Sequence, residues 1–495
     1  MHVLQERPEY VSSTFLECFA SDHQRLAAAA KAAEARARIL AGRPPTDFKH
    51  LPFEVAPPDN VPYSPSRDCE TQALAFSRCG KWLAVAASKA LPQHRSHHTV
   101  VVYSVGQDLE EVGQIHTQSQ PHIAWGSNAH LAIHHMESLQ CAQEPAMPTV
   151  QQTALSGEPL AFVLDVEKWE VVHCLGSATC DALRALGQRV LAGEWCSFGQ
   201  LILIHWRQGG SHPASERLLV VDVHADAIVA TFECSRTQPP AFARHRADHA
   251  AATWHPKLKH LLIVSSEISL SEPRGFTEAG IHVAYLPSCE VHNDSDGAPR
   301  PAECLLLADC FSADGALLSA SMHDFEPDYW QRFDRTMFAI CALSGMAEGK
   351  PAYVLKHAID ECTSMWWAPG RTLLVLHNTT QIRAYDATEA LTGTVLHKFD
   401  LPDFWDLGSG SPPGFVSALG VRRQGSHVER QHCMFDVIHG QQIMEDDNMD
   451  GYWRRSGLAW APSGCAYVYL TKDFVDWERT SRGLKAAVRL ARFVV

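Results

Sequence analysis

The chain has 495 residues, of which 46% are hydrophobic and 20% are charged. That balance is typical of a globular protein and excludes a collagen, a low-complexity polymer and a wholly disordered chain. Asp and Glu number 56 against 42 Lys and Arg, which gives a net charge of −14. Because a general nucleic-acid binder needs a large basic surface, this balance argues against DNA as a partner.

Cysteine usage and the absence of targeting signals indicate the compartment. The 15 cysteines are an odd number, and no two of them form a CxxC pair. Scattered cysteines of this kind are typical of reduced thiols that are buried as small hydrophobic residues. Met1–Tyr10 lacks a basic segment followed by an apolar one, and no apolar run is long enough for a transmembrane segment. We therefore expect a cytoplasmic protein.

Residues 1–69 form an extension whose pattern differs from the rest of the chain. Ser21 is followed three positions later by Gln24, a capping-box pattern, and an Ala-rich stretch of high helix propensity comes next. Gly42 and two prolines end that stretch, so the sequence predicts a helix over about residues 21–41. Because its apolar side is mostly Ala, we expect it to bury little, either on the rest of the chain or on a partner. Residues 51–66 carry five prolines and predict an extended strap.

A short phrase recurs beyond residue 70: a small residue, an aromatic residue, a few loop residues and then an apolar run. The aromatic residues are Phe76, Trp125, Trp195, Trp254, Phe311, Trp367 and Trp460. The interval from Trp367 to Trp460 is nearly twice that from Phe76 to Trp125. This long interval predicts one more unit, near Phe415–Val421, whose aromatic residue has been lost.

A second phrase follows the first within each unit: an apolar strand that ends at Asp, then a turn and another strand. The four clear copies end at Asp165, Asp222, Asp386 and Asp436. Weaker copies are Val101–Ser104, Val283–Leu286 and Phe338–Cys341. Asp436 belongs to the unit without an aromatic residue, which supports the count of units. Short runs rich in Val, Ile, Leu and Tyr are strand signals, so each unit predicts four strands.

Repeated four-stranded units predict a β-propeller, in which each sheet is covered by its neighbours. One such sheet cannot bury both of its surfaces alone, so we expect the recurring aromatic residue to fill the space between neighbouring sheets. The prediction is an all-β fold: a single closed β-propeller over residues 70–495, with eight four-stranded blades, or seven as the alternative. The last unit has room for three strands, and we expect Leu51–Val55 to supply the fourth and close the ring.

Several of these phrases resemble WD40-type repeats. Phe311–Gly315 and the Trp-x-Pro sequences at Trp254, Trp367 and Trp460 resemble the starts of WD40 strands. The four Asp residues match the Asp of the Trp-Asp dipeptide, although none of them follows a Trp. The mean interval also exceeds the roughly 40–45 residues of WD40 repeats. The resemblance covers about residues 70–495 and implies a scaffold that binds other proteins.

The sequence offers no motif for chemistry. A nucleophile elbow, a P-loop and a dinucleotide-binding glycine motif are all missing from it, and no His and Cys spacing indicates zinc. We therefore predict no catalytic, cofactor-binding or metal-binding residues and a non-catalytic scaffold for protein partners. The alternative is an enzyme whose site lies on the propeller axis, where residues from several blades converge without a local motif.

The basic C-terminus leaves a further alternative open. Residues 479–495 carry five Arg and Lys, at a spacing that suits one side of a helix contacting RNA or a membrane surface. Gly483 and the apolar terminal residues favour a strand of the last blade instead. We expect the strand, and we keep an RNA-associated propeller as the second alternative function.

Overall fold

The structure is a computed structural model, and the placed residues cover most of the predicted repeats. The described residues are 18–42, 47–53, 69–90, 96–106, 109–117, 120–126, 129–134, 160–185, 190–196, 200–207, 216–235, 249–250, 252–258, 260–265, 269–270, 280–287, 289–292, 299–312, 315–324, 337–344, 352–359, 364–368, 372–377, 381–386, 395–400, 405–408, 415–424, 427–436, 439–446, 458–473 and 485–492. Of the two described helices, neither is long and apolar enough to cross a membrane. All the cysteines whose side chains are described are free thiols.

The described strands form eight sheets, which we number in chain order. Sheet 1 contains β2 (Cys69–Phe76), β3 (Trp82–Ala90), β4 (Ser96–Val105) and β5 (Leu109–Thr117). Sheet 2 contains β6 (His122–Trp125), β7 (His130–His134), β8 (Ala161–Asp165) and β9 (Glu170–Cys174). Sheet 3 contains β10 (Val190–Trp195), β11 (Leu201–Arg207), β12 (Glu216–Asp222), β13 (Ala227–Ser235) and β17 (Ser269–Leu270). Sheet 4 contains β15 (Ala252–Trp254), β16 (Leu261–Val264) and β18 (His282–Tyr285).

The second half of the chain forms the other four sheets. Sheet 5 contains β14 (His249–Ala250), β19 (Cys289–His292), β20 (Pro299–Phe311), β21 (Leu317–Asp324), β22 (Met337–Ser344) and β23 (Ala352–Ile359). Sheet 6 contains β24 (Ser364–Ala368), β25 (Thr372–His377), β26 (Gln381–Asp386) and β27 (Val395–Asp400). Sheet 7 contains β28 (Trp405–Gly408), β29 (Phe415–Gln424), β30 (His427–Asp436) and β31 (Gln441–Asp446). Sheet 8 contains β1 (Asp47–Phe53), β32 (Leu458–Trp460), β33 (Ala466–Asp473) and β34 (Lys485–Arg492).

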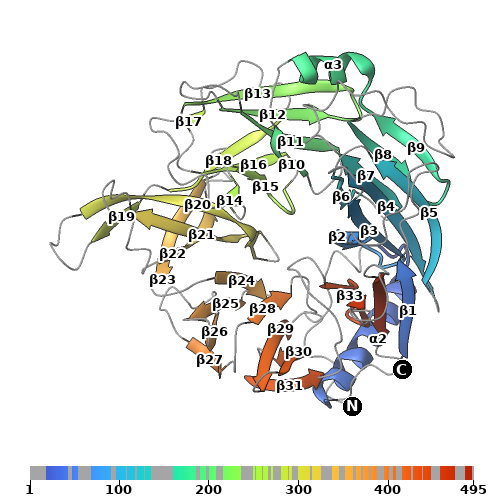
Figure 1. The fold of residues 1–495 in the computed structure, drawn as a ribbon. Helices are drawn as coiled ribbons and strands as arrows, with labels where there is room; N and C mark the ends of the chain where they lie inside the picture. The colour runs from blue at the N-terminus through green and yellow to red at the C-terminus, as the bar shows by residue number, and fades with distance from the viewer. Residues whose placement is uncertain are drawn as a thin grey trace.

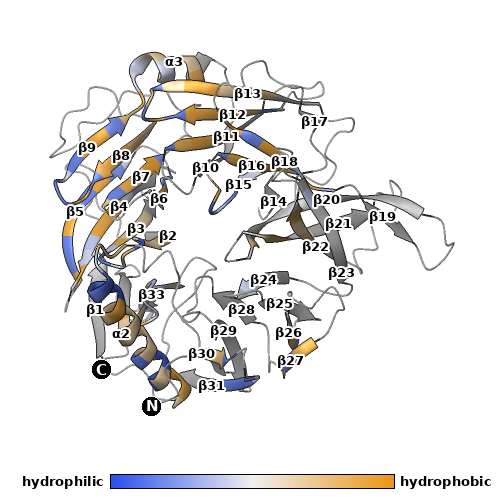
Figure 2. Cartoon of the chain, turned by 180° about the vertical axis from the view of Figure 1, so that it is seen from behind, coloured by the Kyte–Doolittle hydropathy of each residue, from blue (hydrophilic) through white to orange (hydrophobic). Residues whose placement is uncertain are grey.

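The sheets follow one another in chain order around a common centre, with the first strand of each unit toward that centre (Figure 1). Radial arrangement of small antiparallel sheets is the β-propeller architecture, and it confirms the predicted all-β class. Apolar residues concentrate in middle strands such as β8, β11 and β12 (Figure 2). Those strands are covered on both sides by neighbouring sheets, so most of their described side chains are buried.

Apolar clusters join neighbouring sheets, including the first and the last. Leu83 and Val85 of sheet 1 belong to one buried cluster with Val468 and Leu490 of sheet 8. The sheets at the two ends of the repeat region therefore pack directly against each other.

The N-terminal extension supplies one strand to sheet 8. β1 pairs antiparallel with β34 along its whole length, from Asp47 opposite Arg492 to Phe53 opposite Ala486. The prediction that an N-terminal segment adds the fourth strand is confirmed, and the strand begins before the predicted Leu51–Val55. β34 is itself a strand with a partner on each side, so the predicted strand at the C-terminus is confirmed over the helix.

Sheet 4 departs from the predicted unit of four strands. It has three strands in the part of the chain that the structure describes, and β18 runs parallel to β16. After β16 the chain forms β17, which pairs with β13 of sheet 3, and then returns alongside β16 in the same direction. Parallel neighbours require such a long crossover. The predicted pattern of four strands joined by turns is not followed by the described strands of this sheet, although Val283–Tyr285 is a strand as predicted.

The unit that was predicted to lack a repeat aromatic residue is present as sheet 7. The prediction, however, placed the missing aromatic residue on the wrong strand. The predicted location, Phe415–Val421, lies on the second strand, β29, and the first strand of the unit is β28. Asp436 ends the third strand, as predicted. The polar residues between β28 and β29 hid the first strand from a search based on apolar runs.

Helix α2 (Asp22–Leu40) begins and ends as predicted, but its burial was underestimated. The Ser21 side chain accepts a hydrogen bond from the backbone N–H of Gln24, and the left-handed Gly42 follows the helix end. Ala35 and Ile39 are fully buried, at 0% and 1% exposure. An alanine side permits close approach to a sheet, so a mostly Ala surface can be fully covered. The second helix, α3 (Ser177–Ala185), packs on the core between sheets 2 and 3.

A hydrogen bond from His255, directly after β15 of sheet 4, to Gly315, just before β21 of sheet 5, connects these two sheets. Its Nδ1 accepts the backbone N–H groups of Lys257 and Leu258 at 3.1 and 2.8 Å, so its Nε2 carries the proton and donates to Gly315 O at 3.0 Å. The Tyr353 hydroxyl donates to the same carbonyl at 3.0 Å. Gly315 has a φ of +72°, which glycine adopts without a steric penalty.

Substitution of Gly315 by Ala tests this junction. A Cβ there would lie 2.3 Å from His255 Cε1, whereas at Gly80, which also has a φ of +72°, the nearest atom would be Pro462 Cδ at 3.6 Å. We expect Gly80→Ala to cost about 1–2 kcal/mol for the backbone alone and Gly315→Ala roughly 1–3 kcal/mol more for the clash. Denaturant unfolding of the two variants measures the difference, and equal losses would contradict the contact with His255.

Candidate functional site

The repeat aromatic residues lie at or next to the ends of the first strands of their units. Trp125, Trp195, Trp254 and Trp460 are buried, whereas Phe76, Phe311 and Trp367 are partly buried. Each belongs to an apolar cluster that includes residues of the preceding sheet, with sheet 8 preceding sheet 1. The aromatic positions thus lie at the contacts between sheets, which we call seams.

Polar atoms of these aromatic residues also reach across the seams. Trp125 Nε1 donates to the carbonyl of Ala75 in sheet 1 at 2.9 Å. Trp367 Nε1 donates to Ser319 Oγ in sheet 5 at 3.2 Å. A seam therefore combines apolar contact with a directional bond at some positions, which fixes the angle between neighbouring sheets.

The seam between sheets 6 and 7, which has no repeat aromatic at the corresponding position, uses another pair of rings. Phe399 of β27 and Phe435 of β30 lie with their centroids 5.1 Å apart. The ring of His397 also lies against Gly440, where a Cβ would come within 2.3 Å of Nδ1. Outer strands thus supply here the contact that first-strand aromatics supply elsewhere.

The repeat Asp residues end the third strands and hold the turns that follow. Asp222 Oδ1 accepts the backbone N–H groups of His224 and Ala225 at 2.8 and 3.0 Å, and Oδ2 accepts Gln200 Nε2 at 2.8 Å. Asp436 is fully buried and accepts the backbone N–H of His439 at 3.1 Å. The side chain of Asp386 lies outside the described residues. Carboxylates that accept backbone N–H groups in this way stabilise tight turns.

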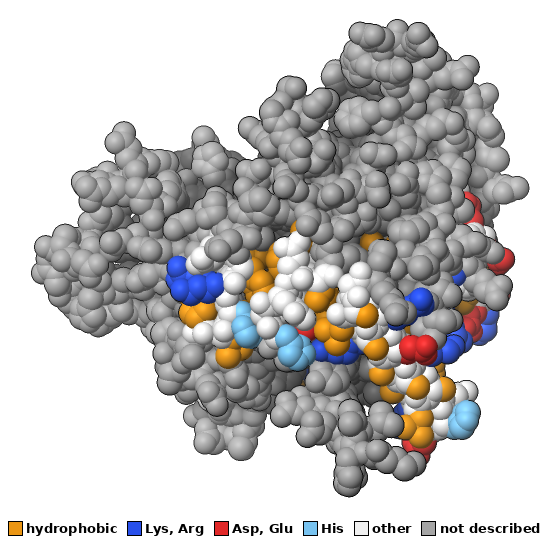
Figure 3. Space-filling model, turned by 90° about the horizontal axis from the view of Figure 1, so that it is seen from below, with side chains coloured by type: hydrophobic (Ala, Val, Ile, Leu, Met, Phe, Trp, Pro, Cys, Tyr) orange, Lys and Arg blue, Asp and Glu red, His pale blue; other side chains and the backbone are white. Residues whose placement is uncertain are grey.

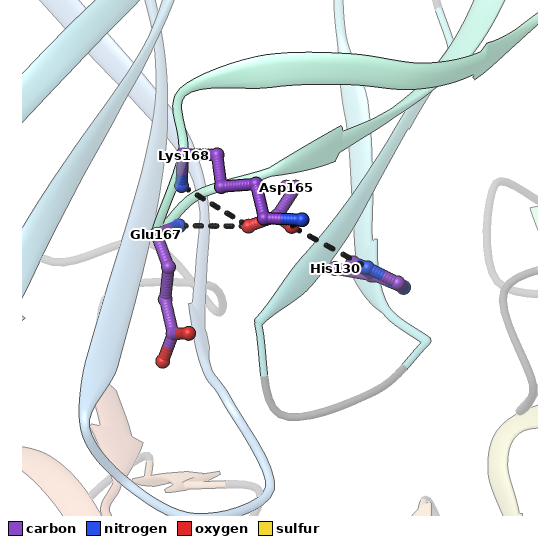
Figure 4. A network of polar contacts seen from close by, with 4 residues as sticks. All are labelled: His130, Asp165, Glu167 and Lys168. Atoms are coloured by element: carbon purple, nitrogen blue, oxygen red, sulfur yellow. Dashed lines mark hydrogen bonds and ion pairs between the residues drawn. The ribbon is translucent and has the colours of Figure 1, made fainter.

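Asp165 shows the same turn with charged neighbours (Figure 4). Its Oδ1 accepts the N–H groups of Glu167 and Lys168 at 3.0 and 3.2 Å, and Oδ2 lies 3.6 Å from Lys168 Nζ and 4.0 Å from His130 Nε2. Burial acts to raise the pKa of Asp165, but these hydrogen bonds and the neighbouring positive charges together hold it below its ordinary value. The group is therefore ionised at neutral pH and supports the turn.

Helix α2 is seated on sheets 7 and 8 by its C-terminal half. Ala35 and Ile39 share a buried cluster with Phe415, Trp460 and Tyr467. The N-terminal half, in contrast, has no buried residue up to Lys31, and Leu26 is 71% exposed. Figure 3 views the molecule from the side on which α2 and β31 lie, and it shows hydrophobic side chains exposed among charged and histidine side chains.

Two further contacts hold the middle of the helix. The guanidinium carbon of Arg36 lies 4.5 Å from the ring centroid of Phe415, a cation–π geometry. The thiol of Cys465 donates to the carbonyl of Lys31 at 3.7 Å. Both contacts are C-terminal to the exposed first turns, so the helix is fixed at one end and presents the other to solvent.

Glu194 is a residue that the sequence search missed. It lies on β10, and its Oε1 accepts Thr253 Oγ1 at 2.7 Å and the N–H of Trp254 at 3.4 Å, both in sheet 4. Burial raises the pKa of Glu194 to about 7, against the opposing effect of those hydrogen bonds. The only sequence signal was its position before the repeat aromatic Trp195, a place where the other units carry small or apolar residues.

The described residues offer limited means for chemistry. Within them no group of three or more His, Cys, Asp and Glu is placed to hold a metal ion.

Comparisons with known proteins identify no family. No model of a known protein family matches the chain, and no curated protein matches it. Among solved structures the chain is similar to Sqt1 from Chaetomium thermophilum, at 11% identity over 88% of this chain and 98% of the other, with a TM-score of 0.44.

Two other similar structures come from archaeal enzymes. The β-propeller domain of the Trilobed protease from Pyrococcus furiosus is 10% identical over 77% of this chain and 99% of that domain, with a TM-score of 0.34. The acylaminoacyl peptidase from Pyrococcus horikoshii is 10% identical over 77% of this chain and 59% of the other, with a TM-score of 0.27. Likeness at this level carries no argument, so the propeller arrangement rests on the sheets described above.

Replacement of Trp367 by Ala tests the seam between sheets 5 and 6. The variant loses the contact with Leu317 and the hydrogen bond to Ser319, and we expect it to lose about 3–5 kcal/mol of unfolding free energy. Ser319→Ala is the control, because it removes the hydrogen bond to Trp367 but keeps the ring, and it should cost about 1 kcal/mol. An unchanged thermal midpoint for Trp367→Ala would show that this ring does not support the seam.

The raised pKa of Glu194 predicts a pH dependence of stability. Its value of about 7 in the folded chain lies above the ordinary 4.5, so the folded state binds the proton more tightly. This contribution is fully present below pH 4.5 and is lost as the pH rises through 7. Relative to Glu194→Gln, the wild type should lose about 2–3 kcal/mol between pH 4.5 and pH 8. Parallel stability curves for the two proteins would contradict it.

Proposed function

We propose that this chain is a single closed propeller of eight blades that acts as a non-catalytic scaffold for a protein partner, and that the exposed half of α2 is its principal contact. The regular sheets, the packing of sheet 8 on sheet 1 and the pairing of β1 with β34 support the closed ring. The residues 1–69 that carry the helix and the closing strand are then an extension of the propeller at 70–495.

The observation that carries the proposal is the contrast between the two halves of α2. Ile39 is 1% exposed and Leu26 is 71% exposed on the same helix. Among the described large apolar side chains that are exposed, Leu26 has the highest exposed fraction, since the others reach 44% at most. Because the buried C-terminal half fixes its direction, the projecting half is ordered before any partner arrives, which lowers the entropic cost of binding.

The exposed side of α2 suits another helix. Leu26, Ala30, Ala33 and Ala37 are all exposed and recur at helical spacing on the side away from Ile39. Small residues allow a second helix to approach closely, while Leu26 provides the apolar anchor. We therefore expect the partner to present an amphipathic helix.

Leu26→Glu tests this contact. The side chain buries nothing in the ring, so the thermal midpoint should not change, whereas recovery of the partner in affinity purification should fall at least tenfold. Leu396→Glu is the matched control, since Leu396 is 42% exposed on β27, away from α2, and its recovery should equal that of the wild type. If Leu26→Glu recovers as much partner as the wild type, the partner binds at another surface.

A truncation of residues 1–45 is not an equivalent test. It would remove Ala35 and Ile39 and uncover Trp460, so loss of the partner could follow from loss of the fold. Ile39→Ala should show that effect, with a loss of about 2–5 kcal/mol in stability.

A further inference from the structure

A β-bulge recurs at one position in the fourth strand of the repeat unit. In sheet 7 the pairing skips Ile443, which lies opposite the peptide bond between Met434 and Phe435. Five other sheets show the same shift at the corresponding place, near the end of the third strand. A bulged residue leaves the regular alternation of its strand, so its side chain is re-aimed. The extra residues of sheets 1, 2, 3, 5, 6 and 7 are Val112, Val172, Val229, Lys356, Leu396 and Ile443.

The bulge of sheet 7 is covered by a helix of the chain itself. Ile443 is partly buried against the cluster that contains Ile39 of α2. The backbone approaches it as well, because a Cβ at Gly42 would lie 3.2 Å from the carbonyl oxygen of Ile443. α2 is rich in alanine and carries four Lys and Arg against two Asp and Glu. The occupant of this bulge is therefore a basic, Ala-rich helix.

The bulges of sheets 1 and 2 present their apolar residues to solvent. Val112 is 38% exposed and Val172 is 37% exposed. Their strands, β5 and β9, lie next to each other at the outer edges of neighbouring sheets in both views (Figures 1 and 2). Trp169, on the turn before β9, lies against β5, because a Cβ at Gly113 would come within 2.4 Å of its ring. The two bulges therefore belong to one continuous outer surface.

This surface is strongly acidic around the two valines. Residues 109–117 and 165–174 together contain five Asp and Glu and one Lys. That lysine, Lys168, lies 3.6 Å from Asp165, so its charge is already matched. We call the two valines and the four exposed glutamates beside them the bulge surface; the glutamates are Glu110, Glu111, Glu167 and Glu170. Leu396 of sheet 6 is also exposed, but the exposed charge next to it is Lys398.

We propose that the bulge surface binds an amphipathic helix of a partner protein, with Ala and Leu against the valines and Lys and Arg facing the glutamates. The equivalent bulge in sheet 7 is covered by a helix of this composition, which identifies the kind of segment that fits. The acidic border complements a basic helix and disfavours an acidic one. A helix that lays its apolar side on a protein surface is a common mode of recognition.

This surface is separate from the partner contact on α2. The bulge surface lies on sheets 1 and 2, whereas α2 is seated on sheets 7 and 8. Binding here should therefore be unchanged in Leu26→Glu, and the two proposals can fail independently.

The probe is a fluorescein-labelled peptide of Ala, Leu and Lys arranged so that one side of a helix is apolar. It has about 20 residues, because shorter isolated helices are marginal in water. Fluorescence anisotropy measures its affinity for the full-length chain and for Leu26→Glu. Bound peptide should slow hydrogen exchange in β5 and β9, and the affinity should fall as salt is added.

Matched variants locate the contact. Val112→Thr combined with Val172→Thr removes two methyl groups from it and should weaken binding about tenfold. Glu110→Gln combined with Glu170→Gln should weaken binding and reduce its salt dependence. Leu396→Thr, at the exposed bulge of sheet 6, is the control and should bind as the wild type does. Thermal midpoints of all variants should match, since each position is partly or fully exposed.

Two altered peptides test the chemistry of the partner. Replacement of every Lys by Glu should abolish binding, and two central prolines, which prevent a helix, should do the same. Equal binding of the Glu peptide, equal binding of the proline peptide as an extended segment, or unchanged affinity of the double valine variant would each overturn the proposal. Slowed exchange confined to strands other than β5 and β9 would overturn it as well.

Discussion

The packing of each sheet against its neighbours is the constraint on which the rest of the structure depends. A sheet of three to six strands has two apolar surfaces and no means of covering them alone. The aromatic residue at the end of a first strand, such as Trp125 or Trp254, fills the seam with the preceding sheet. The same need extends to the ends of the repeat region, where Phe76 packs with the cluster of sheet 8. Pairing of β1 with β34 gives sheet 8 the same four strands that sheets 1, 2, 6 and 7 have.

The seams occupy equivalent positions between neighbouring sheets, but the contacts that form them differ. Most are closed by apolar side chains or neutral hydrogen bonds, as at Trp125 and Ala75. The seam of sheets 3 and 4 has an apolar cluster as well, and in addition it uses the Glu194 carboxyl to join β10 to β15. Sheet 4, to which β15 belongs, is also the sheet in which two strands, β16 and β18, run parallel. The Glu194 carboxyl, next to the least regular sheet, is thus a local departure from the apolar contacts of the other seams that packing alone does not require.

The parts of the fold that recur locally were predictable, and those set by distant partners were not. Repeat aromatics and repeat Asp residues carry their signal within a few positions, because each Asp must hold the turn directly after its own strand. The parallel direction of β18 depends on where β17 finds an edge in sheet 3, which no local pattern records. The burial of α2, seen at Ile39, was underestimated because the alanine content of a helix does not show how closely a sheet can approach it. Glu194 has no motif at all, since its donors come from a strand nearly sixty residues further along the chain.

The extension joins closure of the ring to presentation of the helix. α2 packs on sheets 7 and 8, and β1, which follows it in the chain, completes sheet 8. Ala35 and Ile39 therefore stabilise the same region that β1 completes, and a partner bound to α2 as proposed would stabilise the seated helix through linkage. The direction of the effect is fixed: any ligand that binds the seated helix better than a detached one must favour the seated helix by the same ratio. Under the proposed function, the affinity for the partner at Leu26 and the stability of the helix on sheets 7 and 8 would therefore change together.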